Sequence, residues 1–255
     1  MLIHSRSATW GCSGAVDAAT SAMSSGSTRG GSGRLRGVRG ASWTRANTSH
    51  RNTPVDGGHG YPPWLSCDLP WFRPWAELEQ DATAIRWYEP LLVPGLLQTE
   101  GYARSVLNTG GLLAPSDVDQ IVAGRLERQA VLGHDMPPQL IVVIDGVVLR
   151  RPVGDRAVMA GQLAHLAALA EWRHVQVRVI PAENPWHTGL AGPFVLGRLP
   201  DGTELAYLDN QLRGQVISDP IDIANLGRRW ESVAGEALPQ RRSTELIREV
   251  AETWT

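Results

Sequence analysis

The sequence contains no lysine, and all 24 of its basic residues are Arg. A phosphate-binding loop of the Walker type requires a Lys, and Schiff-base or pyridoxal-phosphate chemistry requires an amine side chain. Those activities are therefore excluded. The only two cysteines, Cys12 and Cys67, lack CxxC spacing and support neither a zinc site nor a disulfide framework. The chain also has no HExxH motif and no nucleophile-elbow pattern, so we expect no metal, no cofactor and no catalytic residues.

Long apolar runs are missing as well. No stretch approaches the roughly 20 apolar residues that a membrane-spanning helix requires. The N-terminus has no apolar region of the kind found in secretory signals. We therefore expect a soluble protein of the reducing cytoplasm that makes no contact with a membrane.

Charge and composition divide the chain near residue 60. Residues 1–60 carry seven Arg against Asp17 and Asp56, a net charge of +5, while residues 61–255 carry 17 Arg against 24 acidic residues, a net charge of −7. The first segment is rich in Ser, Gly and Arg and has few large apolar side chains, so we predict that it is disordered. Residues 61–255 form the predicted folded domain, whose acidic balance makes it a poor binder of a phosphate backbone.

Hydrophobic periodicity in residues 61–255 predicts an α+β domain, mainly helical, with a small and mostly antiparallel sheet. Asp145-Gly146 predicts a hairpin or a kink. Ser116 and Asp155 are the expected caps of two of the helices. The predicted helices are 75–87, 116–133, 155–174, 221–238 and 243–254, and the predicted strands are 139–151, 175–180, 194–199, 204–209 and 213–217.

The stretch WYEPLLVPGLLQTEGYARSVL (residues 87–107) combines two prolines with a run of leucines. Pro90 and Pro94 push Glu89 and Val93 out of the helical region, so the stretch reads as a helix end, a stiff extended turn and a new helix. Thr99 is the expected cap of that new helix. Because so many apolar side chains need a partner surface, we expect the segment to lie across the fold.

These residues also carry a family resemblance. RWYEPLLVPGLLQTEGYARSVL, followed in order by RLERQAVL, VVLRRPVG, QLAHLAAL, VQVRVIP and HTGLAGPFVL, resembles the C-terminal domain of actinobacterial helix-turn-helix regulators of the xenobiotic-response-element type, often called antitoxin-like. The resemblance covers about residues 70–250. It implies a cytoplasmic regulator whose C-terminal domain senses a small-molecule effector, a cognate small protein or a second copy of itself, while a separate helix-turn-helix domain reads DNA.

Residues 1–60 contain no pair of amphipathic helices joined by a turn, which reading a major groove would require. Two explanations remain open: the DNA-binding half has been lost, or this start is a misread frame. DNA binding is therefore expected only through an N-terminal domain that is missing from this sequence. A further hypothesis is that the Arg-rich arm of residues 29–51 binds nucleic acid, in which case its affinity would fall steeply with salt.

Seven side chains are candidates for contact with a ligand or partner. Glu89 is either a buried carboxylate that recognises a ligand or a cap for the amides of residues 91 and 92. Arg150 is either an inward-pointing ligand contact or half of an ion pair with Asp145 or Asp209. The alternative function is a small-molecule enzyme that uses His187 with Asp209 or Asp201 in a Trp-lined cleft. The complete candidate set is Trp87, Glu89, Gln98, Arg150, Trp186, His187 and Phe194.

Overall fold

The structure is a computed structural model that describes residues 72–184, 186–210 and 214–255. The predicted disordered segment 1–60 and the following residues 61–71 lie outside the described part of the chain. None of the described helices combines the length and the apolar character that crossing a membrane requires.

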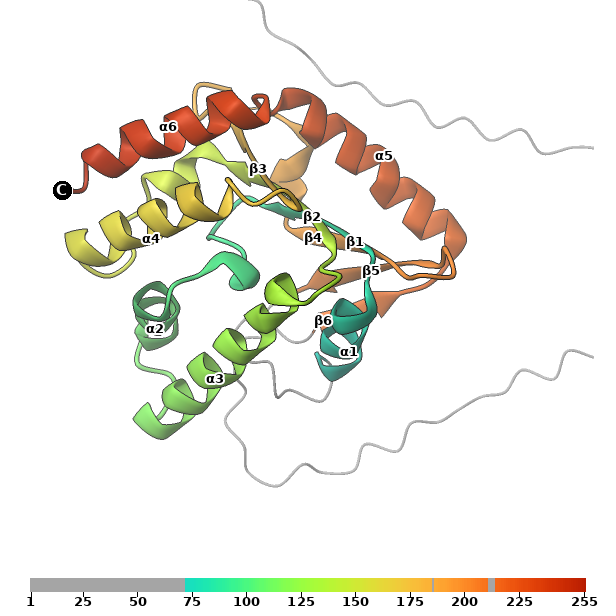
Figure 1. Cartoon of the computed structure of the whole chain (residues 1–255), viewed down its shortest axis with the longest axis horizontal. Helices are drawn as coiled ribbons and strands as arrows, with labels where there is room; N and C mark the ends of the chain where they lie inside the picture. The colour runs from blue at the N-terminus through green and yellow to red at the C-terminus, as the bar shows by residue number, and fades with distance from the viewer. Residues whose placement is uncertain (1–71, 185, 211–213) are drawn as a thin grey trace, which may run out of the picture. The chain divides into compact units, whose positions relative to one another are not determined.

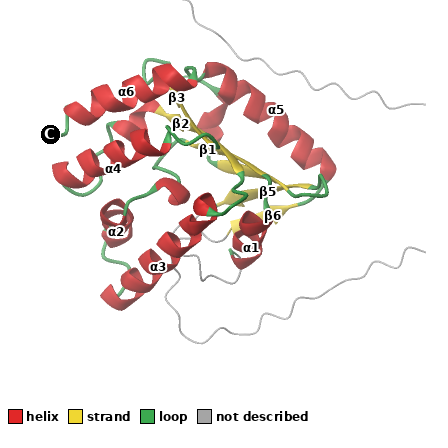
Figure 2. Ribbon diagram, in the orientation of Figure 1, coloured by secondary structure: helices red, strands yellow, loops and turns green. Residues whose placement is uncertain are grey.

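A single six-stranded sheet forms the centre of the fold, with the strand order β3-β2-β1-β4-β5-β6 (Figures 1 and 2). β1, β2 and β3 run parallel, and β4, β5 and β6 form an antiparallel meander that joins the sheet where β4 pairs with β1. The strands are β1 (Ala84–Glu89), β2 (Gln139–Asp145), β3 (Val175–Ile180), β4 (Phe194–Arg198), β5 (Glu204–Asp209) and β6 (Gly214–Ile217).

Different helices cover the two faces of this sheet. One face carries Ile85 and Val142 and packs against α1, α4 and α6, and we call it the α4 face. The opposite face carries Tyr88 and Val143 and packs against α5, and we call it the α5 face. The helices are α1 (Arg73–Asp81), α2 (Glu100–Asn108), α3 (Pro115–Arg128), α4 (Arg156–Leu169), α5 (Pro220–Glu236) and α6 (Gln240–Glu252), and the short 3₁₀ turns are η2 (Gly95–Leu97), η3 (Gln129–Gly133), η4 (Gly146–Leu149) and η5 (Thr188–Ala191).

The predicted α+β class is confirmed, and the sheet is larger and more mixed than the sequence indicated. Two of its five strand pairings are parallel. Parallel neighbours require long crossover connections. These are supplied by α2 and α3 between β1 and β2, and by α4 between β2 and β3. The crossovers bring β1, β2 and β3 side by side, and the pairing of β1 with β4 joins them to the meander in one sheet.

The helix predicted over residues 75–87 is wrong in its second half. α1 ends at Asp81, and Ala84–Glu89 forms β1 at the centre of the sheet. Ile85, Trp87 and Tyr88 are β-branched or aromatic residues that favour strands. A central strand is covered on both faces, so apolar residues occur at consecutive positions and the alternation that identifies a strand is hidden.

The strand predicted over residues 139–151 is also too long. β2 ends at Asp145, and Gly146 begins the turn η4 instead of a hairpin. An added Cβ at Gly146 would lie 2.8 Å from the backbone of residues 180 and 182, so this close approach requires glycine. Because the chain turns here, Arg150 follows a 3₁₀ turn, lies outside the strand predicted for it and is exposed.

Two of the three predicted caps are confirmed. Thr99 accepts a hydrogen bond from the Tyr102 amide at the start of α2, and Asp155 accepts one from the Val158 amide at the start of α4. The cap predicted at Ser116 is wrong, because α3 begins at Pro115 after Ala114. Proline is favoured at the first helical position, where its missing amide hydrogen has no helical partner to lose.

Candidate functional site

The carboxyl ends of the parallel strands define one edge of the sheet. Cross-strand neighbours Trp87 and Val195, and then Val195 and Tyr207, place β1, β4 and β5 in register near this edge. β1 and β5 therefore end here, while β4 begins here. Because successive residues alternate between faces, Trp87, Glu89, Tyr207 and Asp209 all belong to the α4 face.

A cavity of about 360 Å³ opens on the α4 face at this edge. Its volume lies within the range of small-molecule sites, and its walls are mainly apolar and aromatic. Its lining comprises Phe72, Trp75, Trp87, Glu89, Leu91, Leu92, Val93, Gly95, Gln98, Arg125, Arg128, Pro193, Phe194, Val195, Tyr207, Asp209 and Asn210.

Aromatic rings form one wall of the cavity. The fully buried Trp75 ring stacks on Tyr207 with 5.5 Å between centroids, and Phe72 meets Tyr207 edge-on at 5.3 Å. The Arg128 guanidinium lies 4.7 Å from the Phe72 ring centroid, within cation–π distance. Arg128 Nε also lies 2.6 Å from Glu79 Oε2, and Glu79 is fully buried. The wall therefore contains a buried ion pair, in which burial raises the pKa of Glu79 while the charge of Arg128 opposes that rise.

The irregular segment 90–98 forms the opposite wall and is fixed by glutamine side chains. Gln98 Nε2 donates to the Val93 carbonyl at 2.6 Å, and Gln98 Oε1 accepts from Arg125 Nη1 at 2.6 Å. Gln129 Nε2 donates to the carbonyls of Gly95 and Gln98 at 2.9 and 2.8 Å. Buried backbone groups without regular secondary structure require such partners. The segment is therefore held rigid by its own Gln98 and by Gln129 of η3, whose side chains bind its backbone.

Two carboxylates border the cavity. Glu89 Oε1 accepts a hydrogen bond from the Leu91 amide at 3.2 Å, which confirms the cap interpretation of this residue. Burial raises the pKa of Glu89 to about 7, and the nearby charge of Asp209 contributes to that shift. Burial likewise raises the pKa of Asp209 to about 6. Asp209 Oδ1 is buried and has no hydrogen-bond partner among the described residues. Both groups are thus carboxylates whose negative charge is poorly compensated.

The α5 face holds a different acidic site at the same edge. His187 Nε2 lies 3.1 Å from Asp145 Oδ2, and Asp145 Oδ1 accepts from the Val147 amide at 2.9 Å. The Tyr88 ring meets the imidazole edge-on at 6.2 Å. An added Cβ at Gly189 would lie 2.2 Å from the Tyr88 side chain, so only glycine permits this packing. A second cavity, of about 410 Å³, reaches the Asp145 side of this cluster.

The structure brings four of the seven candidate residues together. Trp87, Glu89, Gln98 and Phe194 all line the α4-face cavity. The remaining three are Arg150, Trp186 and His187, and none of them lines it. Trp186 is 82% exposed and is not the predicted aromatic plate of a cleft. Arg150 is exposed and does not reach inward.

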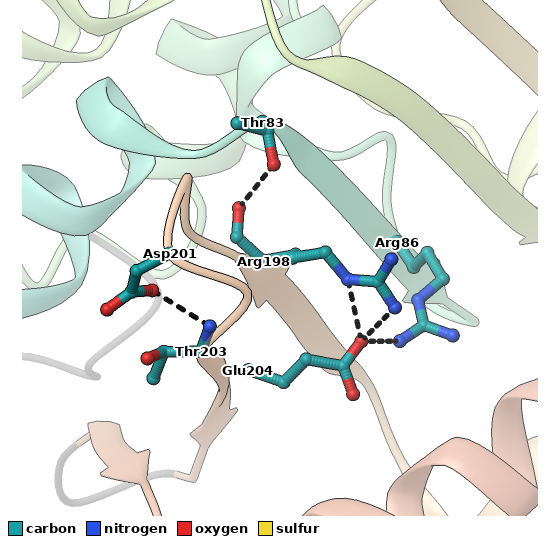
Figure 3. A network of polar contacts seen from close by, with 6 residues as sticks. All are labelled: Thr83, Arg86, Arg198, Asp201, Thr203 and Glu204. Carbon is teal, nitrogen blue, oxygen red and sulfur yellow. Dashed lines mark hydrogen bonds and ion pairs between the residues drawn. The ribbon is translucent and has the colours of Figure 1, made fainter.

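The acidic partners predicted for His187 are also wrong. Asp209 belongs to the α4 face, and Asp201 lies in the turn between β4 and β5 at the opposite edge of the sheet, where its carboxylate accepts from the Thr203 amide (Figure 3). Beside this turn, Glu204 pairs with Arg86 at 3.0 Å and with Arg198 at 2.9 Å. The carboxylate that His187 contacts is Asp145, which the sequence placed in a turn.

Sequence reasoning missed Asp209, Tyr207, Trp75 and Arg125 as parts of the cavity. Asp209 is the last residue of a predicted strand, and an acidic residue at the end of an apolar strand was the available signal for it. Arg125 lies in α3, where it is only 7% exposed and donates a hydrogen bond to Gln98. Within the described ranges, no group of three or more His, Cys, Asp or Glu side chains is placed to hold a metal ion.

Comparison with known proteins gives a family and nothing narrower. No curated protein and no solved structure matches the sequence. One family model, a domain of unknown function named DUF5753, matches residues 72–249. That range contains both walls of the α4-face cavity and both carboxylates that border it. The chain belongs to the DUF5753 family.

Proposed function

We propose that residues 72–249 form the sensing domain of an antitoxin-like, cytoplasmic transcriptional regulator, and that the α4-face cavity holds its small-molecule effector. DNA reading belongs to a separate helix-turn-helix domain of such a regulator. The regulator context rests on the ordered motifs that resemble C-terminal domains of helix-turn-helix proteins. A cognate small protein or a second copy of the chain is the other kind of effector that this resemblance implies.

The observation that carries the small-molecule assignment is the cavity itself. It combines an apolar, aromatic interior with a few fixed polar groups, which is typical of ligand sites. It also lies outside the carboxyl end of β1, where the strand order changes direction between β1 and β4. By analogy with other open α/β sheets, ligands bind at such a point. Its rigid wall of glutamine-bound backbone supplies a preformed surface.

The test uses N-phenyl-1-naphthylamine, a neutral dye whose fluorescence rises in apolar surroundings, with the full-length chain. We expect saturable binding and a higher melting temperature, because a ligand that binds only the folded state stabilises it. Leu92→Trp fills the cavity and should abolish binding. Leu112→Trp makes the same change at an exposed position outside the cavity lining and should leave binding intact. Equal binding by both variants, or none by the parent chain, would contradict the proposal.

The alternative function is an enzyme that uses His187, and the contact between His187 and Asp145 favours it. We give it second place because the His187 side chain is only 1% exposed. A general base has to reach the proton that it removes from a substrate. The other ring nitrogen, Nδ1, is buried and has no partner among the described residues. This environment supports a role for His187 in packing the loop before β4.

A further inference from the structure

The two carboxylates at the cavity also carry information about the charge of its ligand, an inference that rests on the proposed sensing function. Glu89 ends β1 and Asp209 ends β5, with the start of β4 between the two strands. Neighbouring strands are about 4.8 Å apart, so the two backbones are separated by about 10 Å. Both side chains leave the same face of the sheet. One small group placed between them can therefore approach both carboxylates.

No cation balances these two charges within the described part of the chain. Glu89 accepts hydrogen bonds from the Leu91 and Leu92 amides and from the Trp87 side chain, and Asp209 accepts one from the Asn210 amide; all of these donors are neutral. Neither forms an ion pair with an Arg in the described structure. The two arginines of the cavity bind elsewhere: Arg128 pairs with Glu79, and Arg125 donates to Gln98. Among the described residues, the cavity is therefore short of positive charge where Glu89 and Asp209 border it.

The interior suits the rest of such a ligand. Trp75, Trp87 and Tyr207 belong to the lining of the cavity, and aromatic rings attract cations as well as apolar groups. Tyr207 is 5% exposed, and its hydroxyl is buried with no partner among the described residues. Neither this hydroxyl nor the buried Asp209 Oδ1 has a hydrogen-bond donor in the described structure, and a bound amine would supply one.

We propose that the cavity selects an amine with an apolar or aromatic body, whose ammonium group lies between the carboxylates of Glu89 and Asp209. Its three N–H donors can serve both acids. Binding would hold both carboxyl groups in their charged form. Because burial raises the pKa of Glu89 to about 7 and that of Asp209 to about 6 in the free protein, binding near pH 6.5 should release protons.

The experiment compares three probes with one ring system: tryptamine, tryptophol and indole-3-propionate, which end in an ammonium, a hydroxyl and a carboxylate. A second series on a phenyl ring controls for the size of the body. Titration calorimetry on the full-length chain should give the order ammonium, hydroxyl, carboxylate in both series, with about tenfold or more between the first two, because hydrogen bonds to charged groups are stronger than those between neutral groups. Repeating the tryptamine titration in buffers of different ionisation enthalpy reports the released protons.

Asp209→Asn should lower the affinity for tryptamine about tenfold and leave the affinity for tryptophol unchanged, because only the charged ligand loses its charged partner. Asp201→Asn is the matched control at the opposite edge of the sheet and should change neither affinity. A hydroxyl probe that binds as tightly as the amine, or an unchanged preference in Asp209→Asn, would overturn the inference.

The outcomes also separate this inference from the function on which it rests. If the ammonium probe is not preferred in either series, while N-phenyl-1-naphthylamine binds and Leu92→Trp blocks that binding, the cavity is a ligand site without amine selectivity. If neither the dye nor any probe binds, both the amine inference and the sensing role of the cavity are wrong.

Discussion

The two faces of the sheet present acidic residues at the same edge, and they surround those residues differently. On the α5 face, Asp145 has one oxygen on the Val147 amide and the other beside His187. On the α4 face, Glu89 accepts hydrogen bonds from backbone amides and from the Trp87 side chain but has no cationic partner among the described residues. Asp209 accepts from the Asn210 amide, and its Oδ1 has no partner in that part of the chain. A carboxylate with its partners in place stabilises the fold, whereas one without them costs free energy that a ligand can recover.

Deeper in the α4-face wall, Glu79 and Arg128 show the paired arrangement again. Glu79 is fully buried, so its charge depends entirely on the neighbouring side chains. Substitutions at paired and at unpaired acids should therefore change the free energy of unfolding in opposite directions. Removing a partner should destabilise the fold at Glu79 and Asp145. Removing the charge itself should stabilise it at Glu89 and Asp209 under conditions where these groups are ionised.

The largest effect is expected for Arg128→Met, which leaves Glu79 buried without its cation. Removing one member of a buried ion pair costs about 3–5 kcal/mol of unfolding free energy. Urea denaturation at pH 7 measures it. Arg104→Met is the control, since Arg104 pairs with Glu100 and Asp119 on the surface and such pairs contribute about 0.2–1 kcal/mol. Adding Glu79→Gln to Arg128→Met should recover part of the loss, and no recovery would contradict the charge explanation.

A smaller loss is expected for His187→Ala. The substitution opens space beside Tyr88 and leaves Asp145 Oδ2 without its partner, which together should cost about 2–3 kcal/mol. Thermal unfolding at pH 7 is the measurement. His134→Ala removes an exposed imidazole and should change stability by less than about 0.5 kcal/mol. Equal effects of the two variants would mean that the cluster around His187 is not a packed unit.

The smallest effect, of opposite sign, is expected for Glu89→Gln and Asp209→Asn. Their folded pKa values, about 7 and about 6, lie above the ordinary 4.5 and 3.8. The folded state therefore binds more protons than the unfolded state between those limits, so the parent chain loses stability as the pH rises through them. Each amide variant has no carboxyl group to ionise at that position, so it should not lose this stability as the pH rises.

Relative to the parent chain, each variant should gain about 1–2 kcal/mol at pH 8, after allowance for partial exposure, and almost nothing at pH 4. Urea unfolding of both variants and the parent across this pH range tests the sign. Asp145→Asn is the contrasting control, because its carboxylate is paired and the change should not stabilise the protein at pH 8. A stabilised Asp145→Asn, or destabilised Glu89→Gln and Asp209→Asn at pH 8, would contradict the comparison.

Local chemistry made several parts of the fold predictable. The alternation of VQVRVI identifies β3 with its bounds, and Thr99 and Asp155 cap the helices that follow them. Each of these features depends on a few neighbouring residues, so the sequence contains the complete signal. β1 was misread as helix because other elements of the fold cover both faces of this central strand and remove the alternation.

Part of the site was equally predictable. Glu89 and Gln98 lie at the two ends of a stiff segment with two prolines that had to pack against something, and Trp87 and Phe194 belong to strands that meet there. Asp209 was considered only as a partner for Arg150 or His187. Its real neighbours on the α4 face follow from the order β1-β4-β5, which brings together residues more than 100 positions apart.

The sequence by itself determined the α+β class, the caps at Thr99 and Asp155, most strand and helix positions, and the exclusion of lysine chemistry. The tertiary structure alone decided which acid faces which partner: Asp145 with His187 on the α5 face, and Glu89 near Asp209 on the α4 face. The physical reason is that the side a strand residue faces alternates with every position, while its neighbours depend on strand order and register. Those are set by crossovers and packing over the whole domain.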